Sequence, residues 1–143
     1  MKVEPYLLFN GRCEEALNFY RTALGAEITG LMRFKENPEP MAGPNGCAPP
    51  PGTEEKILHA SFRIGETTVM ASDGMASGNA EFKGISLTIT VPTDAEAERL
   101  FKALSAGGQV QMAIGKTFYA TAFGMVVDRF GVSWMVINPL PMP

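Results

Sequence analysis

The chain repeats one succession of strand and helix after about eighty residues. A strand-like segment at 3–9 precedes a helix-like segment at 14–24, and the same succession recurs at 85–91 and 93–104. Three further strand-like segments follow each helix. Because halves of a 143-residue chain are too small to bury enough apolar area separately, we expect one α+β domain built from two tandem βαβββ modules.

The two modules are expected at 1–73 and 85–143, joined by a small and polar linker at 74–84. Two such modules that share a core enclose a concavity between them. Concave, partly apolar surfaces are where proteins bind small molecules. The duplication therefore predicts a small-molecule site.

Helix ends are marked in both modules. Gly25 follows the apolar stripe of the first helix, in a position typical of a helix end. Thr93 and Glu96 form a capping box that starts the second helix. The remaining strands are expected at 27–34, 56–64, 67–72, 109–114, 118–127 and 133–138.

The segment 35–55 interrupts the first module with closely spaced prolines and glycines. A loop of this length inside a compact domain is either functional or disordered. Two interpretations stay open: a lid that touches the ligand, and a plain mobile insertion.

Charge and composition exclude several classes of function. The net charge is −3 and the basic residues are scattered, so no footprint for nucleic acid or an anionic membrane is present. The start of the chain has no signal-peptide pattern and no segment is apolar over a membrane's width, so we expect a soluble cytoplasmic protein. Nucleotide-binding, zinc-peptidase and hydrolase motifs are absent from the sequence.

The two cysteines, Cys13 and Cys47, form neither a Cys-x-x-Cys motif nor a disulfide framework, and we expect two reduced thiols. Cys13 lies near a helix start, where the helix dipole favours a thiolate. The adjacent Glu14 and Glu15 oppose that effect, so a nucleophilic role is not favoured.

Alternation within the strands predicts which side chains face the concavity. The apolar residues of 56–64 and 67–72, such as Phe62 and Val69, belong under the helices, and the residues between them face the opposite side. In the second module Trp134 belongs under the helix and its neighbour Met135 faces the concavity. The predicted ligand-binding residues are His59, Ser61, Arg63, Thr68, Met70, Ser72, Ser86, Thr88 and Met135.

Each chemically distinctive residue has a second interpretation. His59 is the only histidine and serves either ligand binding or proton transfer, or it is a strand histidine bonded to backbone or water. Arg63 either binds an anion bidentately or forms a surface pair with Glu66. Met70 and Met135 are either adaptable walls for an apolar ligand or ordinary core filling.

The paired modules and several short segments resemble the vicinal oxygen chelate superfamily, the group of glyoxalase I, bleomycin-resistance proteins and extradiol dioxygenases. The segments shared with the superfamily are ALNFY at 16–20, LGA at 24–26 and DRFG at 128–131. Those that resemble its PhnB-like branch are PYL at 5–7, FNG at 9–11, HA at 59–60, MASD at 70–73 and FGVSW at 130–134. The resemblance implies one cupped, partly open sheet of eight strands with the helices outside, and a homodimer.

The resemblance also implies where a divalent metal would bind. Enzymes of the superfamily place His or Glu ligands on the first and last strands of each module, at positions that fall here on Pro5, Met70, Ser86 and Met135. None of these side chains is a usual ligand for Mg, Mn, Zn or Fe. A shift of one residue would bring Glu4 to the first position without supplying the other three, so we expect no metal and no cofactor.

The sequence therefore favours a metal-free small-molecule-binding protein of the glyoxalase/bleomycin-resistance type. A second hypothesis is an enzyme of lyase, isomerase or dioxygenase class that acts on a small oxygenated substrate at an atypical site around His59, the one candidate catalytic residue. A third is a structural or regulatory dimer with a vestigial pocket.

Overall fold

The computed structural model describes residues 1–36, 52–74 and 80–141. Most of the proline-rich segment 35–55, including Cys47, lies outside the described residues. The two interpretations of this segment, a lid and a mobile insertion, therefore also fall outside the described residues. The chain divides into two compact units at residues 1–80 and 81–143, within the linker expected at 74–84. None of the helices in the described part of the chain is long and apolar enough to cross a membrane.

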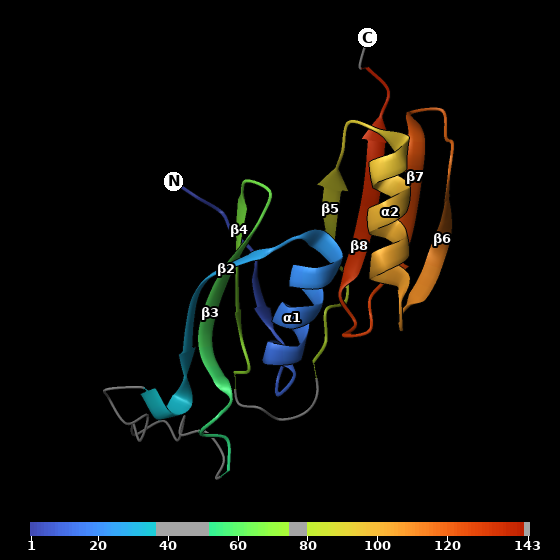
Figure 1. Cartoon of the computed structure of the whole chain (residues 1–143). Helices are drawn as coiled ribbons and strands as arrows, with labels where there is room; N and C mark the ends of the chain where they lie inside the picture. The colour runs from blue at the N-terminus through green and yellow to red at the C-terminus, as the bar shows by residue number, and fades with distance from the viewer. Residues whose placement is uncertain (37–51, 75–79, 142–143) are drawn as a thin grey trace. The chain divides into compact units, whose positions relative to one another are not determined.

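Unit 1 is a mixed sheet with one covering helix (Figure 1). Its strands lie in the order β1-β4-β3-β2, with β1 parallel to β4 and the other pairs antiparallel. Its elements are β1 (Tyr6–Leu8), α1 (Cys13–Leu24), β2 (Glu27–Arg33), a 3₁₀ turn (Phe34–Glu36), β3 (Ile57–Ile64) and β4 (Thr67–Ser72).

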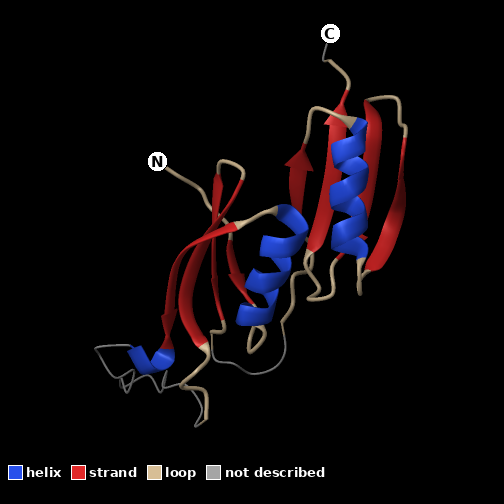
Figure 2. Ribbon diagram, viewed as in Figure 1, coloured by secondary structure: helices blue, strands red, loops and turns tan. Residues whose placement is uncertain are grey.

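Unit 2 repeats this topology with the order β5-β8-β7-β6. Figure 2 shows that α2 lies over its sheet as α1 lies over the first sheet. Its elements are β5 (Ser86–Thr90), α2 (Asp94–Ser105), β6 (Gln109–Gly115), β7 (Ala120–Val127) and β8 (Ser133–Pro139). The parallel pair is again formed by the first and last strands, β5 and β8. The structure confirms the predicted α+β fold of two tandem βαβββ modules, with the eight strands divided between two four-stranded sheets.

Helix α1 covers the apolar face of its sheet. Its buried residues lie one turn apart, and the ring of Tyr20 stacks on that of Phe62 in β3, with centroids 5.9 Å apart. Ala60 and Phe62 are therefore on the helix side, as the alternation predicted. Gly25 ends the helix in the left-handed conformation with φ of 67°, which glycine adopts without steric cost.

Helix α2 covers the second sheet in the same way. Thr93 caps its start, because the Thr93 hydroxyl oxygen accepts from the Glu96 amide at 3.2 Å. Phe101 packs on Gly124 of β7 so closely that a Cβ atom there would lie 2.6 Å from the ring. Trp134 is 2% exposed, which agrees with its predicted place under the helix.

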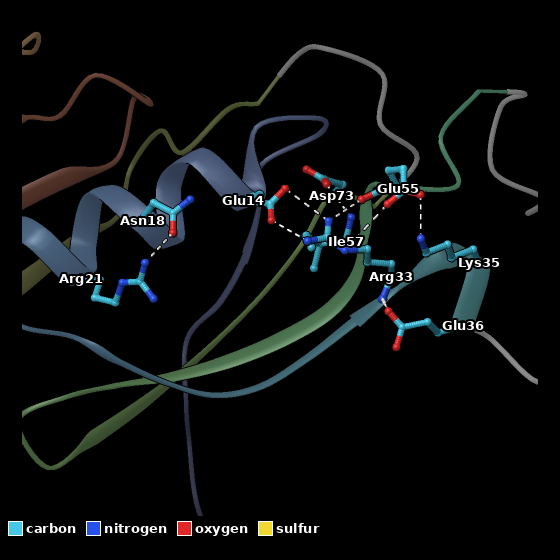
Figure 3. Close-up of polar contacts among 9 residues, drawn as sticks. All are labelled: Glu14, Asn18, Arg21, Arg33, Lys35, Glu36, Glu55, Ile57 and Asp73. Carbon is cyan, nitrogen blue, oxygen red and sulfur yellow. Dashed lines mark hydrogen bonds and ion pairs between the residues drawn. The ribbon is translucent and has the colours of Figure 1, made fainter.

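A buried carboxylate, Asp73, fastens the start of α1 to the sheet. One oxygen accepts from the amides of Gly11 at 2.7 Å and Cys13 at 2.8 Å. The other accepts from the Ile57 amide at 2.8 Å (Figure 3). One side chain thereby holds two chain segments, residues 11–13 and the start of β3. Asp73, which directly follows β4, is 1% exposed and connects these two segments in the interior of unit 1.

An exposed ion-pair cluster joins α1 to the neighbouring strands on the same side of unit 1 (Figure 3). The Arg33 guanidinium donates to Glu14 and to the Glu55 carbonyl oxygen, and Lys35 pairs with the Glu55 carboxylate at 2.7 Å. The hydrogen bond from Arg33 lowers the pKa of Glu14. The cluster links the helix start, the end of β2 and the approach to β3.

Candidate functional site

The face of the first sheet away from α1, here called the open face of unit 1, carries most of the predicted site. Tyr6 lies opposite Met70, and Met70 lies opposite Ser61, so one row of this face runs across three strands. The next row contains His59 opposite Met32. The side chains on this face are Tyr6, Leu8, Met32, His59, Ser61, Arg63, Thr68 and Met70.

Tyr6 and His59 meet across the sheet. The Tyr6 hydroxyl oxygen lies 3.1 Å from His59 Nδ1, and the centroids of the two rings are 5.6 Å apart. Because β4 lies between β1 and β3, the two side chains meet above β4. His59 Nε2 has no hydrogen-bond partner among the residues that the structure describes, so this nitrogen is available to a ligand.

Apolar side chains flank this pair. Met32, opposite His59, is 38% exposed, and Leu8 at the end of β1 is 48% exposed. Met70 is half-buried beside Tyr6. An imidazole bordered by exposed apolar groups can hold a molecule that is mainly apolar and carries one polar atom.

The remaining polar residues of β3 are already paired. The Ser61 and Thr29 hydroxyls lie 2.9 Å apart, with Thr29 at an irregularity in the register of β2. Arg63 pairs with Glu27 at 2.6 Å, with both side chains at least half exposed. The surface-pair interpretation of Arg63 agrees with this contact, although the predicted partner Glu66 was wrong.

Ser72 is unsuited to ligand binding, which corrects the prediction. It is 5% exposed, donates to the Leu58 carbonyl oxygen at 2.7 Å and accepts from the Gly74 amide at 2.8 Å. Its hydroxyl therefore holds the end of β4 in place. Thr68, on the same strand, is half-buried opposite Arg63.

The register also corrects the position inferred for the first metal ligand. Pro5 precedes β1 and offers its carbonyl oxygen to the Met70 amide at 2.9 Å, while Tyr6 is the residue opposite Met70. The corresponding pair in unit 2 is Thr88 and Met135, so Ser86 lies one row away. Over the described ranges, no three His, Cys, Asp or Glu side chains are grouped to hold an ion.

The open face of unit 2, on the side of its sheet away from α2, carries hydroxyls and thioethers. The Ser86 and Ser133 hydroxyls are 2.8 Å apart, and the Thr88 hydroxyl lies 3.6 Å from the sulfur of Met135. Met135 is followed across the sheet by two methionines that the sequence analysis did not select. This row consists of Met135, Met125 and Met112.

Several residues of these faces were missed although the pattern contained a signal. Tyr6, Leu8 and Met32 belong to strands whose faces the sequence analysis did not assign. Counting alternate residues from the buried Leu7 would have placed Tyr6 and Leu8 opposite the helix. The hydrogen bond between Tyr6 and His59 carries no sequence signal, because the two residues are far apart in the chain.

Cys13 is a structural residue. Its side chain is fully buried at the start of α1, and burial raises the pKa of the thiol far above its usual range, with smaller contributions from Asp73 and Glu14. A thiol held in this form is a poor nucleophile. The geometry agrees with the expectation that Cys13 is not catalytic.

Comparison with known proteins places the chain in a family. A sequence model described as 3-demethylubiquinone-9 3-methyltransferase matches residues 1–137. Protein YjdN of Escherichia coli (strain K12) is 38% identical over 141 residues, which cover 95% of this chain and 94% of that protein.

Solved structures extend the likeness. Protein PA1353 from Pseudomonas aeruginosa is 42% identical with a TM-score of 0.82, over 96% of this chain and 97% of that one. The PhnB protein from Bacillus cereus is 30% identical with a TM-score of 0.78, over 96% and 99% of the two chains. A glyoxalase-related enzyme from Fulvimarina pelagi, 16% identical with a TM-score of 0.60 over 96% and 88%, shares the fold. The chain belongs to the PhnB-like family whose model is described as 3-demethylubiquinone-9 3-methyltransferase.

Proposed function

We propose that the protein binds a small, mainly apolar molecule, and that His59 on the open face of unit 1 is its polar anchor. The observation that carries the proposal is an exposed imidazole whose Nε2 has no hydrogen-bond partner within residues 1–36, 52–74 and 80–141, with the apolar Met32 opposite it. Membership of a family related to glyoxalases and bleomycin-resistance proteins supports a small-molecule ligand.

Binding without a divalent metal is part of this proposal. The equivalent facing pairs are Tyr6 with Met70 and Thr88 with Met135. Phenol, hydroxyl and thioether groups are poor ligands for Mg, Mn, Zn and Fe, which bind carboxylate and imidazole in proteins. The donor set therefore favours recognition by hydrogen bonding and apolar contact.

An enzymatic function is the second candidate, because the exposed imidazole of His59 is placed where it could take part in proton transfer with a bound substrate. The family description names methyl transfer to a demethylated ubiquinone. An assay for this candidate follows a ligand over time by mass spectrometry, with and without S-adenosylmethionine. Turnover that is lost in His59→Gln would establish catalysis.

We further propose a cytoplasmic homodimer. The open face of unit 2 carries exposed apolar side chains such as Met112, and a second chain can cover such a surface. Sedimentation velocity tests this state directly, and a monomer at micromolar concentration would contradict it. A dimer without a ligand would instead support the third hypothesis, a structural or regulatory protein.

Thermal unfolding in the presence of a metabolite library tests the binding proposal. A ligand at a hundred times its Kd stabilises the folded state by about 2.7 kcal/mol, which gives a measurable rise in Tm. We expect His59→Ala to abolish the rise and to lower the ligand-free Tm only slightly, since His59 is exposed and loses only its contact with Tyr6. The exposed Glu98→Gln on α2 is the control, with the rise retained.

Two results would overturn the proposal. One is a library in which no compound raises Tm, which points to a vestigial pocket. The other is a stoichiometric divalent ion in protein purified without chelators, lost in His59→Ala, which points to metal chemistry.

A further inference from the structure

We infer that Tyr6 fixes the tautomer of His59 so that Nε2 carries the proton, and that the site consequently selects a ligand with an uncharged oxygen acceptor of the carbonyl class. The inference rests on the proposed function, which it deepens by naming a positioning residue and the class of ligand. Its starting point is the contact of 3.1 Å between the Tyr6 hydroxyl and His59 Nδ1.

The direction of this hydrogen bond follows from the two groups. A neutral imidazole has one nitrogen that donates and one that accepts, and the partner of one nitrogen sets the role of the other. A phenol donates better than it accepts, because its oxygen shares electrons with the ring. Tyr6 therefore donates to Nδ1, and the proton of His59 is on Nε2.

The pair is held in place by the sheet. The register fixes Tyr6 of β1 opposite Met70 of β4. It fixes His59 of β3 opposite Met32 of β2. Their rings are tilted by 38° with centroids 5.6 Å apart, so the contact includes ring packing as well as the hydrogen bond. This geometry leaves Nε2–H as a donor toward whatever occupies the open face.

The charges on the face favour an uncharged acceptor. Arg63 lies four residues from His59 on the same face of β3, and Glu27 balances its charge through a contact of 2.6 Å. Met32, which lies opposite His59, is apolar, and so is Leu8, which lies two residues from Tyr6 on β1. A donor N–H among apolar groups and a neutralised arginine suits a carbonyl oxygen on an apolar body.

Nitrogen NMR of the imidazole tests the tautomer without any ligand. His59 is the only histidine, so ¹⁵N-labelled protein gives one set of ring signals. In alkaline buffer we expect the proton on Nε2, and Tyr6→Phe should move the Nδ1 resonance toward that of an unbonded lone pair. Tyr119→Phe, which removes a phenol hydroxyl of similar exposure in unit 2, should change neither nitrogen. The inference is overturned if the proton is found on Nδ1, or if the chemical shift of Nδ1 does not change in Tyr6→Phe.

Three probes of similar size test the ligand class. Acetophenone should shift the Nε2 signal, whereas ethylbenzene, which lacks the oxygen, should not. Equal responses to these two, or no response to either, overturn the acceptor assignment, and tighter binding of benzoate overturns the preference for an uncharged group. If no compound in the metabolite library raises Tm, the proposed binding function fails. The tautomer of His59 is measured in the protein without ligand, so that result does not depend on the library, and the two failures are distinguishable.

Discussion

The indole nitrogen of Trp134 donates a hydrogen bond to Asp128 Oδ2 at 2.8 Å in the interior of unit 2. The other oxygen of Asp128 accepts from the amides of Phe130 at 2.9 Å and Val132 at 3.0 Å. One buried carboxylate therefore fixes both the turn between β7 and β8 and the position of the only tryptophan.

Asp128→Ala is expected to destabilise the protein by about 3–5 kcal/mol, because it leaves buried donors without an acceptor. Urea unfolding measures the loss. Emission of Trp134, the only tryptophan, should change in the folded state as its hydrogen bond is removed. The exposed Glu98→Gln should change neither quantity, and an unaltered stability in Asp128→Ala would contradict the assigned role.

Gly124→Ala is expected to cost about 1–3 kcal/mol by overpacking, since the new Cβ would lie 2.6 Å from the Phe101 ring. Gly115→Ala on β6 is the matched control, because its nearest neighbour would be 3.9 Å away. Combining Gly124→Ala with Phe101→Leu should recover part of the loss. Equal stabilities of the two alanine variants would show that the helix can move away from the sheet at little cost.

Cys13 should resist alkylation in the folded protein. In a Cys47→Ser background, iodoacetamide should modify the remaining thiol roughly a hundredfold or more slowly in native buffer than in urea. The reason is its complete burial, which keeps reagent away and raises the pKa of the thiol. Mass spectrometry follows the reaction, and rapid native labelling would mean that the start of α1 opens readily.

The pair of Glu14 and Arg33 should make stability depend on pH in a definite direction. The pKa of Glu14 is lowered from its ordinary value of 4.5 in the folded state, so its contribution is present above that value and is lost as the pH falls below it. The effect is small because the Glu14 side chain is 53% exposed. We therefore expect Glu14→Gln to lower the urea midpoint slightly at neutral pH and not at acidic pH. High salt should reduce the difference, and a difference that grows on acidification would contradict the assignment.

The sequence pattern predicted the secondary structure well where the signal was local. Both helices, the cap at Thr93 and the end at Gly25 were identified from neighbouring residues. Strand β1 is shorter than the predicted 3–9, because its parallel register pairs Tyr6–Leu8 with the last residues of β4. Such limits depend on a partner strand that is distant in the sequence.

The candidate site shows the same division between local and distant information. Alternation assigned the faces of His59 and Arg63, because the period of a strand is local. The partners of these residues, Tyr6 and Glu27, come from other strands and were not identified. Ser72 was misassigned because its bonds to Leu58 and Gly74 depend on how the chain turns after β4.

The two repeats share a topology and differ in the chemistry of their open faces. Unit 1 presents the imidazole of His59, and unit 2 presents hydroxyls and a row of methionines. The βαβββ module is therefore duplicated in this chain, whereas the imidazole of unit 1 has no counterpart in unit 2. The proposed anchor His59 is the only histidine of the chain, so we expect saturation at one equivalent of ligand per chain although each chain contains two modules.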